Sequence, residues 1–314
     1  LVVGFALFAG FIYFINEESI QKLKEIRWLP AAGALVATLG ITSSIAFRWG
    51  TIVNALEGKK LASWHRYYHY FIQSRALGFV LPKDFTDFGV RILWLKRSHK
   101  SSLSDAGVSV FIDRLYDLMA MLILLVSVVP YWFGGISAAY TAGLMVIIIL
   151  AFGYLLIYQQ HYLLRLMQQL LNFALKLFSV FPFVKKRLPR RINIPDFGKK
   201  TNTRIYAVSI LKMAFTMARF VMFAFALNII VNPEIIILGT PLGQLGYLFS
   251  FTPGGLGIFE AGWYGILQLA AVSTQTALLF VVGQRVLTIA IILLLTFLSQ
   301  AYFGLISSRI KKAE

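Results

Sequence analysis

Several charged side chains stand inside long apolar runs of this sequence, where each could bind a charged ligand. Arg219 lies within FTMARFVMFAFAL, and Arg285 lies within VVGQRVLTIAI. A charged residue at the centre of a membrane-spanning helix costs at least ~2.5 kcal/mol on insertion scales, so such residues are rare and often functional. Because neither run contains an acid, we expect Glu260 to pair with Arg285 or Arg219. A purely structural buried ion pair is the alternative.

A second group of charges occurs in VFIDRLYDL, near the start of another apolar run. Asp113 and Asp117 are four residues apart and share one helix face, while Arg114 and Asp117 are three apart and could pair directly. Asp87 and Arg91, four apart after Pro82, are the equivalent charges earlier in the chain. These charges could line a hydrophilic groove, or they could form a self-neutralising structural cluster at the membrane interface. The sequence leaves both interpretations open.

No recognisable enzyme motif accompanies these charges. The glycines of TPGGLG are not followed by the Lys-Ser/Thr pair that a phosphate-cradling loop requires, and no strand is predicted before them. The sequence has no cysteine, which excludes disulfides and cysteine catalysis. We therefore expect no catalytic residues, no cofactor and no metal site, although a membrane-embedded lipid transferase remains an alternative. The histidines also lack metal-ligand spacing, and they are His65, His69, His99 and His161.

The elements that position the charges must be membrane helices. Of the 314 residues, 58% are hydrophobic and 14% are charged, against about 25% charged in soluble domains. The apolar residues form runs of about the length that crosses a ~30 Å hydrocarbon core, without the alternation of a membrane β-barrel. We predict an all-α polytopic bundle. The runs are Ala31–Phe47, Leu118–Val129, Leu144–Tyr158, Phe215–Val231 and Leu278–Leu298.

The net charge of +17 follows the membrane topology rather than a nucleic-acid surface. Lys and Arg gather between apolar runs, in stretches 48–66, 83–100 and 159–204, whereas 131–139 carries no charge. Cytoplasmic loops have this bias. We expect a multi-pass protein of the cell membrane, with the basic loops and the C-terminus cytoplasmic and no nucleic-acid partner.

Two basic stretches flank the apolar segment Tyr67–Pro82, so this segment should enter the membrane and return on the same side. A similar break follows later, at Pro253, and each proline precedes an arginine by the same distance: 114 − 82 = 32 and 285 − 253 = 32. With three crossings in between, the sequence predicts inverted repeats at about 67–130 and 235–308. The predicted structural breakers are Pro82, Pro253, Gly254, Gly255 and Gly257.

This pattern predicts one integral membrane domain over 1–314, with about six full spans and two re-entrant hairpins. Eight full spans are the alternative. Leu1–Phe14 is interpreted as a clipped first span, because it lacks the basic start and the cleavage site of a signal peptide. The basic insertion 159–204 should include a helix at Tyr162–Phe178 that lies on the inner leaflet, or else a simple loop that sets the topology.

Three blocks of this sequence together resemble a known family: LPKDFTDFGVR, SVFIDRLYDL and TPGGLGIFEAG. They are similar, in the same order, to blocks in the transmembrane, flippase-like region of lysylphosphatidylglycerol synthases and its stand-alone relatives. The resemblance spans most of residues 70–290. It implies a lipid-handling membrane protein that lacks the aminoacyl-transferase domain, because the chain ends soon after its last apolar run.

The function that this resemblance implies is translocation of an anionic phospholipid or a polyprenyl-linked lipid between leaflets. Guanidinium groups pair bidentately with phosphate, so Arg114, Arg219 and Arg285 would line the groove for the headgroup. Asp87, Asp117 and Glu260 would hold these arginines, or bind a cationic headgroup. The alternatives are a non-transporting scaffold for a glycosyltransferase and the lipid transferase named above.

Overall fold

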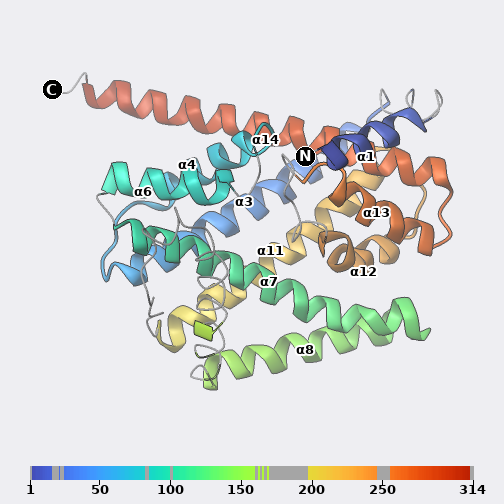
Figure 1. The fold of residues 1–314 in the computed structure, drawn as a ribbon, viewed down its shortest axis with the longest axis horizontal. Helices are drawn as coiled ribbons and strands as arrows, with labels where there is room; N and C mark the ends of the chain where they lie inside the picture. Colours follow the sequence, from blue (N-terminus) through green and yellow to red (C-terminus); the bar gives the residue numbers. More distant parts are fainter. Residues whose placement is uncertain are drawn as a thin grey trace.

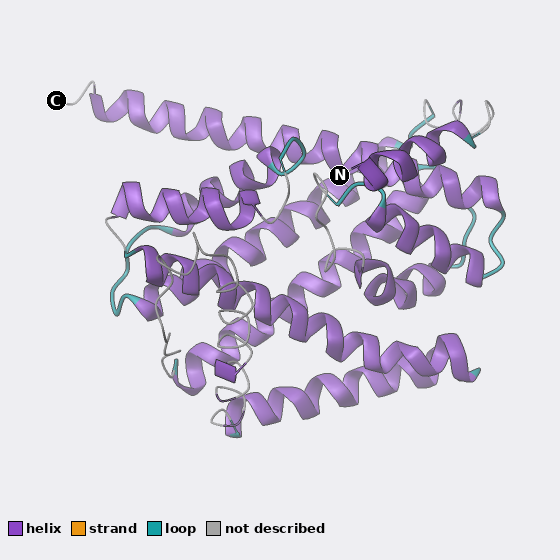
Figure 2. Ribbon diagram, viewed as in Figure 1, coloured by secondary structure: helices purple, strands orange, loops and turns teal. Residues whose placement is uncertain are grey.

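The computed structural model describes residues 2–15, 21, 25–81, 85–99, 102–159, 162, 165, 168, 169, 197–245 and 255–311. Within these ranges the chain forms helices joined by short connections and contains no strand (Figures 1 and 2). The expectation of an all-α bundle is confirmed. The predicted breakers Pro82, Pro253 and Gly254 lie outside the described residues.

Long helices run from one end of the bundle to the other (Figure 1). Among the described residues, four helices are long and apolar enough to cross a membrane: α3, α8, α11 and α14. At 1.5 Å per residue, the 29 residues of α3 extend about 44 Å, more than the ~30 Å that a bilayer core requires. The long helix α7 lies among them. The bounds of the five helices are α3 (Trp28–Leu56), α7 (Leu103–Gly134), α8 (Ala138–Tyr158), α11 (Gly198–Ala226) and α14 (Thr274–Lys311).

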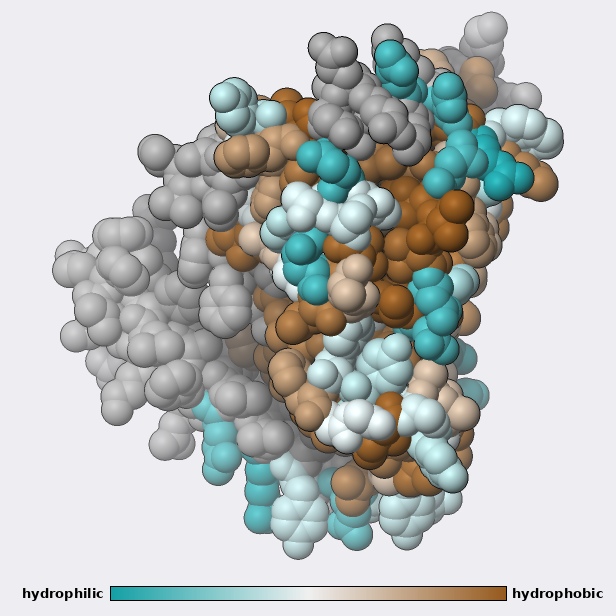
Figure 3. All heavy atoms as spheres, turned by 90° about the vertical axis from the view of Figure 1, so that its right-hand side faces the viewer, coloured by the Kyte–Doolittle hydropathy of each residue, from teal (hydrophilic) through white to brown (hydrophobic). Residues whose placement is uncertain are grey.

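The outer flanks of the bundle are apolar. On α8, the exposed fractions of Val146, Ile147 and Leu150 are 56%, 64% and 66%, and on α14 Phe297 is 69% exposed. Rows of large exposed apolar side chains on long helices are stable in lipid and unfavourable in water. Figure 3 views one end of the bundle, where hydrophilic residues are interspersed among apolar ones. The chain is a multi-pass membrane protein.

Two pairs of short helices form hairpins. In the first, α4 (Trp64–Leu77) runs inward, and the π-helix η1 (Thr86–Val90) and α6 (Arg91–His99) return beside it. In the second, α12 (Pro233–Gln244) packs against α13 (Ile258–Leu269). The two hairpins occupy opposite ends of the bundle in Figure 1. The first hairpin is longer than predicted: the segment Tyr67–Pro82 was expected to enter and return by itself, but it supplies only one arm, and the other arm lies in the stretch 83–100 that was expected to be a cytoplasmic loop. The re-entrant position of the hairpins in a bilayer and the repeat itself stay predictions.

Local sequence explains how the two helices of the second hairpin begin. Gly255 and Gly257 have φ of 75° and 84°, a left-handed region that glycine enters without the steric cost of a Cβ. Gly257 is the N-cap of α13, and its N–H donates to Oε2 of Glu260 over 2.7 Å. This half of a capping box satisfies a backbone donor at the helix start. At the start of α12, the side chain of Asn232 accepts from the N–H of Glu234 over 3.1 Å.

The centre of the bundle is the packing of α3 against α11. A Cβ on Gly33 would lie 2.9 Å from Sδ of Met222, and one on Gly40 would lie 2.7 Å from the Phe215 ring. Glycine therefore lets the two helices approach closely at both points. Gly33 meets Met222, and Gly40, later on α3, meets Phe215, which is earlier on α11. The two helices are therefore antiparallel.

The flanking segments agree only in part with the expected boundaries. Because α11 begins at Gly198, residues 198–204 belong to this helix and not to the predicted insertion 159–204. The interfacial helix predicted at Tyr162–Phe178 falls largely outside the described residues. Near the N-terminus, α1 (Val2–Tyr13) packs against α13 and α14.

Candidate functional site

A cluster of buried charges joins α3, α7 and α11. Arg48 on α3 donates from Nε to Oδ1 of Asp113 over 2.7 Å, and its Nη1 lies 2.8 Å from Oδ1 of Asp117. Nη1 of Arg48 also donates to the Ser209 hydroxyl over 2.9 Å. Nζ of Lys212 lies 3.1 Å from Asp117. As predicted, Asp113 and Asp117 present one face of α7, and here that face meets a guanidinium.

Arg91, the first residue of α6, completes this cluster. Its Nη2 lies 2.9 Å from Oδ2 of Asp113, so the carboxylate of Asp113 is shared between two arginines. The guanidinium also stacks on Trp49, with Cζ 4.2 Å from the ring centroid. Stacking and ion pairing together compensate for the burial of a charge. No partner was predicted for Arg91 from the sequence, and the structure places it against Asp113.

Asp87 belongs to a separate ion pair. The π-helix η1 places its carboxylate toward α7, where Nη2 of Arg114 forms a salt bridge with Oδ2. The Ser74 hydroxyl donates to the carbonyl of Thr86 over 2.9 Å and lies 3.3 Å from Oδ1 of Asp87. π-Helical turns often occur at functional sites. Arg114 thus connects α7 to the hairpin, a contact that the spacing within α7 did not predict.

A cavity of about 360 Å³ lies beside both groups of charges. This volume is within the range of small-molecule sites, about 300–1,000 Å³. Five basic and three acidic side chains line it, so the formal balance of the lining is 5 − 3 = +2. The apolar part of the wall includes Ile41, Ile45, Phe71, Phe111, Leu118 and Met121, and the charged part comprises Arg75, Arg91, Arg114, Lys212, Arg219, Asp87, Asp113 and Asp117.

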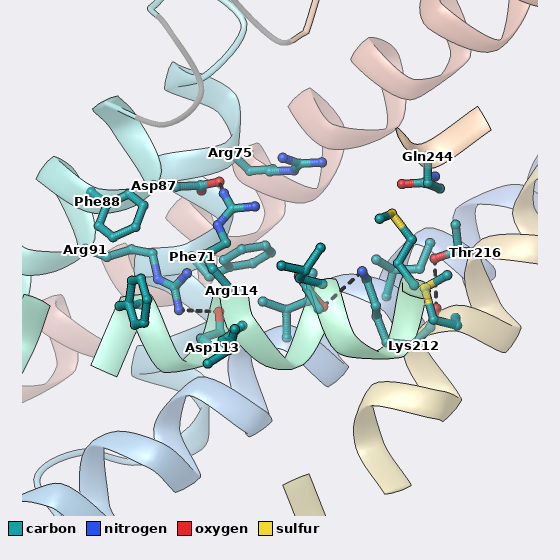
Figure 4. A pocket seen from close by; sticks show the side chains of 18 of the residues that line it. Phe71, Arg75, Asp87, Phe88, Arg91, Asp113, Arg114, Lys212, Thr216 and Gln244 are labelled. Atoms are coloured by element: carbon teal, nitrogen blue, oxygen red, sulfur yellow. Dashed lines mark hydrogen bonds and ion pairs between the residues drawn. The ribbon is translucent and has the colours of Figure 1, made fainter. Parts of the chain in front are cut away.

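Figure 4 shows how the charged side chains face the cavity. Arg114 points toward Asp87, and Arg75 reaches from α4 across the cavity toward Gln244 at the end of α12. Among the described residues, no ion pair involves Arg75. Arg219 also lines the cavity, and its guanidinium lies 4.9 Å from the Phe220 ring centroid. The site therefore combines paired charges in the wall with a guanidinium that points into the space.

The second predicted ion pair lies elsewhere. Nη1 of Arg285 on α14 is 3.2 Å from Oε1 of Glu260 on α13, which confirms the expected contact. The two side chains are 5% and 0% exposed. Arg285 lines a smaller adjoining cavity of about 30 Å³, and the residues that line the larger cavity include neither Arg285 nor Glu260. The predicted groove lined by Arg114, Arg219 and Arg285 is thus divided between two cavities.

Three residues of the site were missed in the sequence. Arg48 was assigned to a basic loop, although it stands between Phe47 and Trp49 at the end of an apolar run. Arg75 lies inside the segment predicted to be a hairpin, and Lys212 interrupts SILKMAF. The signal that could have found all three is the one used for Arg219 and Arg285, a single charge in apolar surroundings.

Comparison with known proteins agrees with this architecture. The family model of the lysylphosphatidylglycerol synthase TM region matches residues 1–296 of the 314. A comparison with curated proteins finds no significant match. The match covers the two hairpins, the long helices up to residue 296 of α14 and the charged residues of the site, and it connects the chain with a membrane lipid-related function. The chain therefore belongs to the lysylphosphatidylglycerol synthase transmembrane-region family.

Proposed function

We propose that the protein moves an anionic phospholipid or another lipid with a phosphate-bearing headgroup between the leaflets of the cell membrane. The observation that carries the proposal is the cavity of about 360 Å³, whose lining has a formal charge of +2. A headgroup with one negative phosphate would partly neutralise that surplus. Guanidinium groups match phosphate oxygens in geometry and charge.

The arrangement of the wall suits a headgroup better than a free ion. Apolar side chains from α3, α4 and α7 line the same cavity as the charges, so the polar headgroup would be held while the acyl chains remain in lipid. Arg75 would contact the phosphate first, because it points into the space from the arm of a hairpin. Asp87 and Asp117 would fix the orientation of Arg114 and Lys212.

We place the basic connections on the cytoplasmic side, following the positive-inside bias. In this orientation the ends of α3, α6 and α14 near residues 56, 99 and 311 face the cytoplasm. The partners of the protein are then membrane lipids, and a polyprenyl-linked lipid fits the same chemistry as a phospholipid. No catalytic step is required of any residue in this proposal.

The test is leaflet exchange in proteoliposomes with fluorescent phosphatidylglycerol, a polyprenyl-phosphate analogue and zwitterionic phosphatidylcholine. We expect faster exchange of one of the anionic lipids than in empty liposomes, with little effect on phosphatidylcholine. The Arg75→Ala variant should reduce the gain severalfold or more. Arg204→Ala is the matched control, since it removes one exposed arginine from α11 outside the cavity.

Two results would count against translocation. Exchange that equals empty liposomes for every lipid would favour a scaffold that recruits a glycosyltransferase or another enzyme. Turnover of the lipid into a new product by the purified protein would favour a membrane-embedded transferase.

A further inference from the structure

One face of α7 runs from the first hairpin, past the large cavity, to the C-terminal end of the helix. Its residues are four or seven positions apart, which is about one or two helical turns, so they lie one above the other. Among them are Gly107, Arg114, Leu118, Leu122 and Val129. The face therefore has a part before the cavity, a part that lines it and a part beyond it.

The first hairpin covers the part before the cavity. A Cβ on Gly107 would lie 3.8 Å from Cδ1 of Ile92, a residue of α6. One helical step further on, Arg114 forms its salt bridge with Asp87 of η1. On this face of α7, the hairpin therefore blocks a path that leads from the cavity toward the N-terminal end of the helix.

The middle part of the face lines the large cavity through Phe111, Arg114 and Leu118. It ends near the centre of the helix, because Leu118 is 118 − 103 = 15 residues from the first residue of α7 and 134 − 118 = 16 from the last. Up to this point the face carries the charge of Arg114, and beyond it the face is apolar. The boundary between the polar and the apolar part thus lies halfway along α7.

The part beyond the cavity is uncovered. Leu122, Val126 and Val129 are 42%, 61% and 40% exposed. From Leu118 to Val129 the helix rises by 129 − 118 = 11 residues, or about 17 Å. This is about half of the ~30 Å hydrocarbon core, which is the depth that the acyl chains of one leaflet fill. The face thus has the polarity of a phospholipid, with charge at one end and an apolar stretch of acyl-chain length at the other.

We infer that residues 118–129 of α7 form an acyl-chain track, which holds the chains of an anionic phospholipid while its headgroup occupies the large cavity. The inference rests on the proposed function for the identity of the headgroup. Because the hairpin blocks the other direction, the chains extend toward the C-terminal end of α7. The bound lipid therefore points the same way as a lipid in the leaflet at the N-terminal end of α7.

This direction distinguishes the bound lipid from the lipid that surrounds every membrane helix. In the leaflet at the C-terminal end of α7, headgroups lie near the end of the helix and the methyl ends of the chains lie near its centre. A lipid on the acyl-chain track lies the other way round. Its ester groups are near Leu122, and the ends of its chains are near Val129.

The test reads the chain direction from fluorescence quenching in proteoliposomes. The chain has no natural cysteine, so an introduced cysteine carries the only bimane label. Leu122→Cys and Val129→Cys place the label on the track. Leu150→Cys and Gly143→Cys on exposed positions of α8 are the matched controls. They stand equally far from the connection between the helices, since 134 − 122 = 150 − 138 = 12 and 134 − 129 = 143 − 138 = 5.

The quencher is a nitroxide on an acyl chain of phosphatidylglycerol or phosphatidylcholine, placed near the ester group or near the methyl end. With phosphatidylglycerol, we expect Leu122→Cys to be quenched severalfold more by the nitroxide near the ester group, and Val129→Cys more by the one near the methyl end. The two α8 controls should show the opposite order, which is that of the bulk bilayer. Phosphatidylcholine should give the bulk order at all four positions.

The Arg75→Ala substitution connects the track with the cavity. In this background, phosphatidylglycerol should give the bulk order on α7 as well, because the headgroup has lost a guanidinium that points into the cavity. The α8 controls should not change.

Two outcomes would overturn the inference. The bulk order on α7 with phosphatidylglycerol would make the face an ordinary lipid-exposed surface. A reversed order with phosphatidylcholine as well would separate the face from the charged cavity. Lipid exchange distinguishes these failures from that of the proposed function: exchange without the reversed order refutes only the track, whereas the reversed order without exchange refutes translocation.

Discussion

Arg48 and Asp113 are 65 positions apart in the chain, yet Nε and Oδ1 lie 2.7 Å apart and both side chains are only 1% exposed. The carboxylates of Asp113 and Asp117 on α7 therefore provide the negative charge that compensates for burying the Arg48 guanidinium. This ion pair connects α3 with α7 beside the large cavity, which Asp113 also lines.

Asp113→Ala should strongly destabilise the protein. It leaves the buried charges of Arg48 and Arg91 without their shared carboxylate, and breaking a buried ion pair costs about 3–5 kcal/mol. Thermal unfolding in detergent, followed by light scattering or size exclusion, measures the loss. The control is Glu234→Ala, which removes an exposed acid from the first turn of α12 and should cost about 1 kcal/mol or less. Equal unfolding temperatures for the two variants would contradict the assignment.

Arg91→Lys should destabilise the protein by about 1–2 kcal/mol although the charge is retained. In the native protein, Cζ of Arg91 lies 4.2 Å from the centroid of the Trp49 ring. A lysine can keep the ion pair with Asp113 but cannot stack on this ring. Arginine and lysine differ most at stacked sites. The same unfolding measurement applies, with Arg204→Lys on the exposed part of α11 as the control. A stable Arg91→Lys variant would show that the stacking contributes little.

Glu260 should respond differently to its two substitutions. Glu260→Gln keeps an oxygen that can accept from the N–H of Gly257 but removes the charge that faces Arg285, whereas Glu260→Ala removes both. Loss of a helix cap costs about 1 kcal/mol, so the alanine variant should be less stable than the glutamine variant by about that amount. Parallel denaturant titrations provide the comparison. If the variants were equally stable, the cap would have no energetic role.

Gly40→Ala should weaken the contact between α3 and α11. The new Cβ would lie 2.7 Å from the Phe215 ring, so the helices must separate or the ring must move, at a cost of about 1–3 kcal/mol. Gly143→Ala on α8 is the matched control, because no atom lies within 4 Å of its Cβ position, and alanine raises helix propensity by up to about 1 kcal/mol. The two variants should shift the unfolding temperature in opposite directions. A shift in the same direction would mean that Gly40 is not a close-packing position.

Much of the fold was predictable because lipid imposes strong constraints on the sequence. Runs such as Leu144–Tyr158 and Leu278–Leu298 became α8 and α14. The two basic stretches around Tyr67–Pro82 indicated a hairpin in this region, although this segment forms only one of its arms. The boundaries were harder to predict where helices continue past the apolar run. Thus α11 begins at Gly198, well before Phe215.

The site was predictable in its residue types but not in its pairings. Isolated charges in apolar runs identified Arg219 and Arg285, and one pairing, that of Glu260 with Arg285, followed from the shortage of other acids. Spacing within one helix allowed Arg114 to pair with Asp117, but it gave no partner on another helix. The structure instead pairs Arg114 with Asp87, because the π-helix brings that carboxylate onto α7, and no local pattern encodes that approach.

The helix α8 lies between α7 and α11 in the chain, and this position has a consequence for membrane insertion. It packs on α7 and α11, with only 17% of its most apolar window buried. As the chain emerges during synthesis, α8 must cross the membrane before α11 can enter from the opposite direction to α3. A defect in the insertion of this one weakly packed helix would leave the second half of the protein facing the wrong way, with every residue of its ion pairs intact.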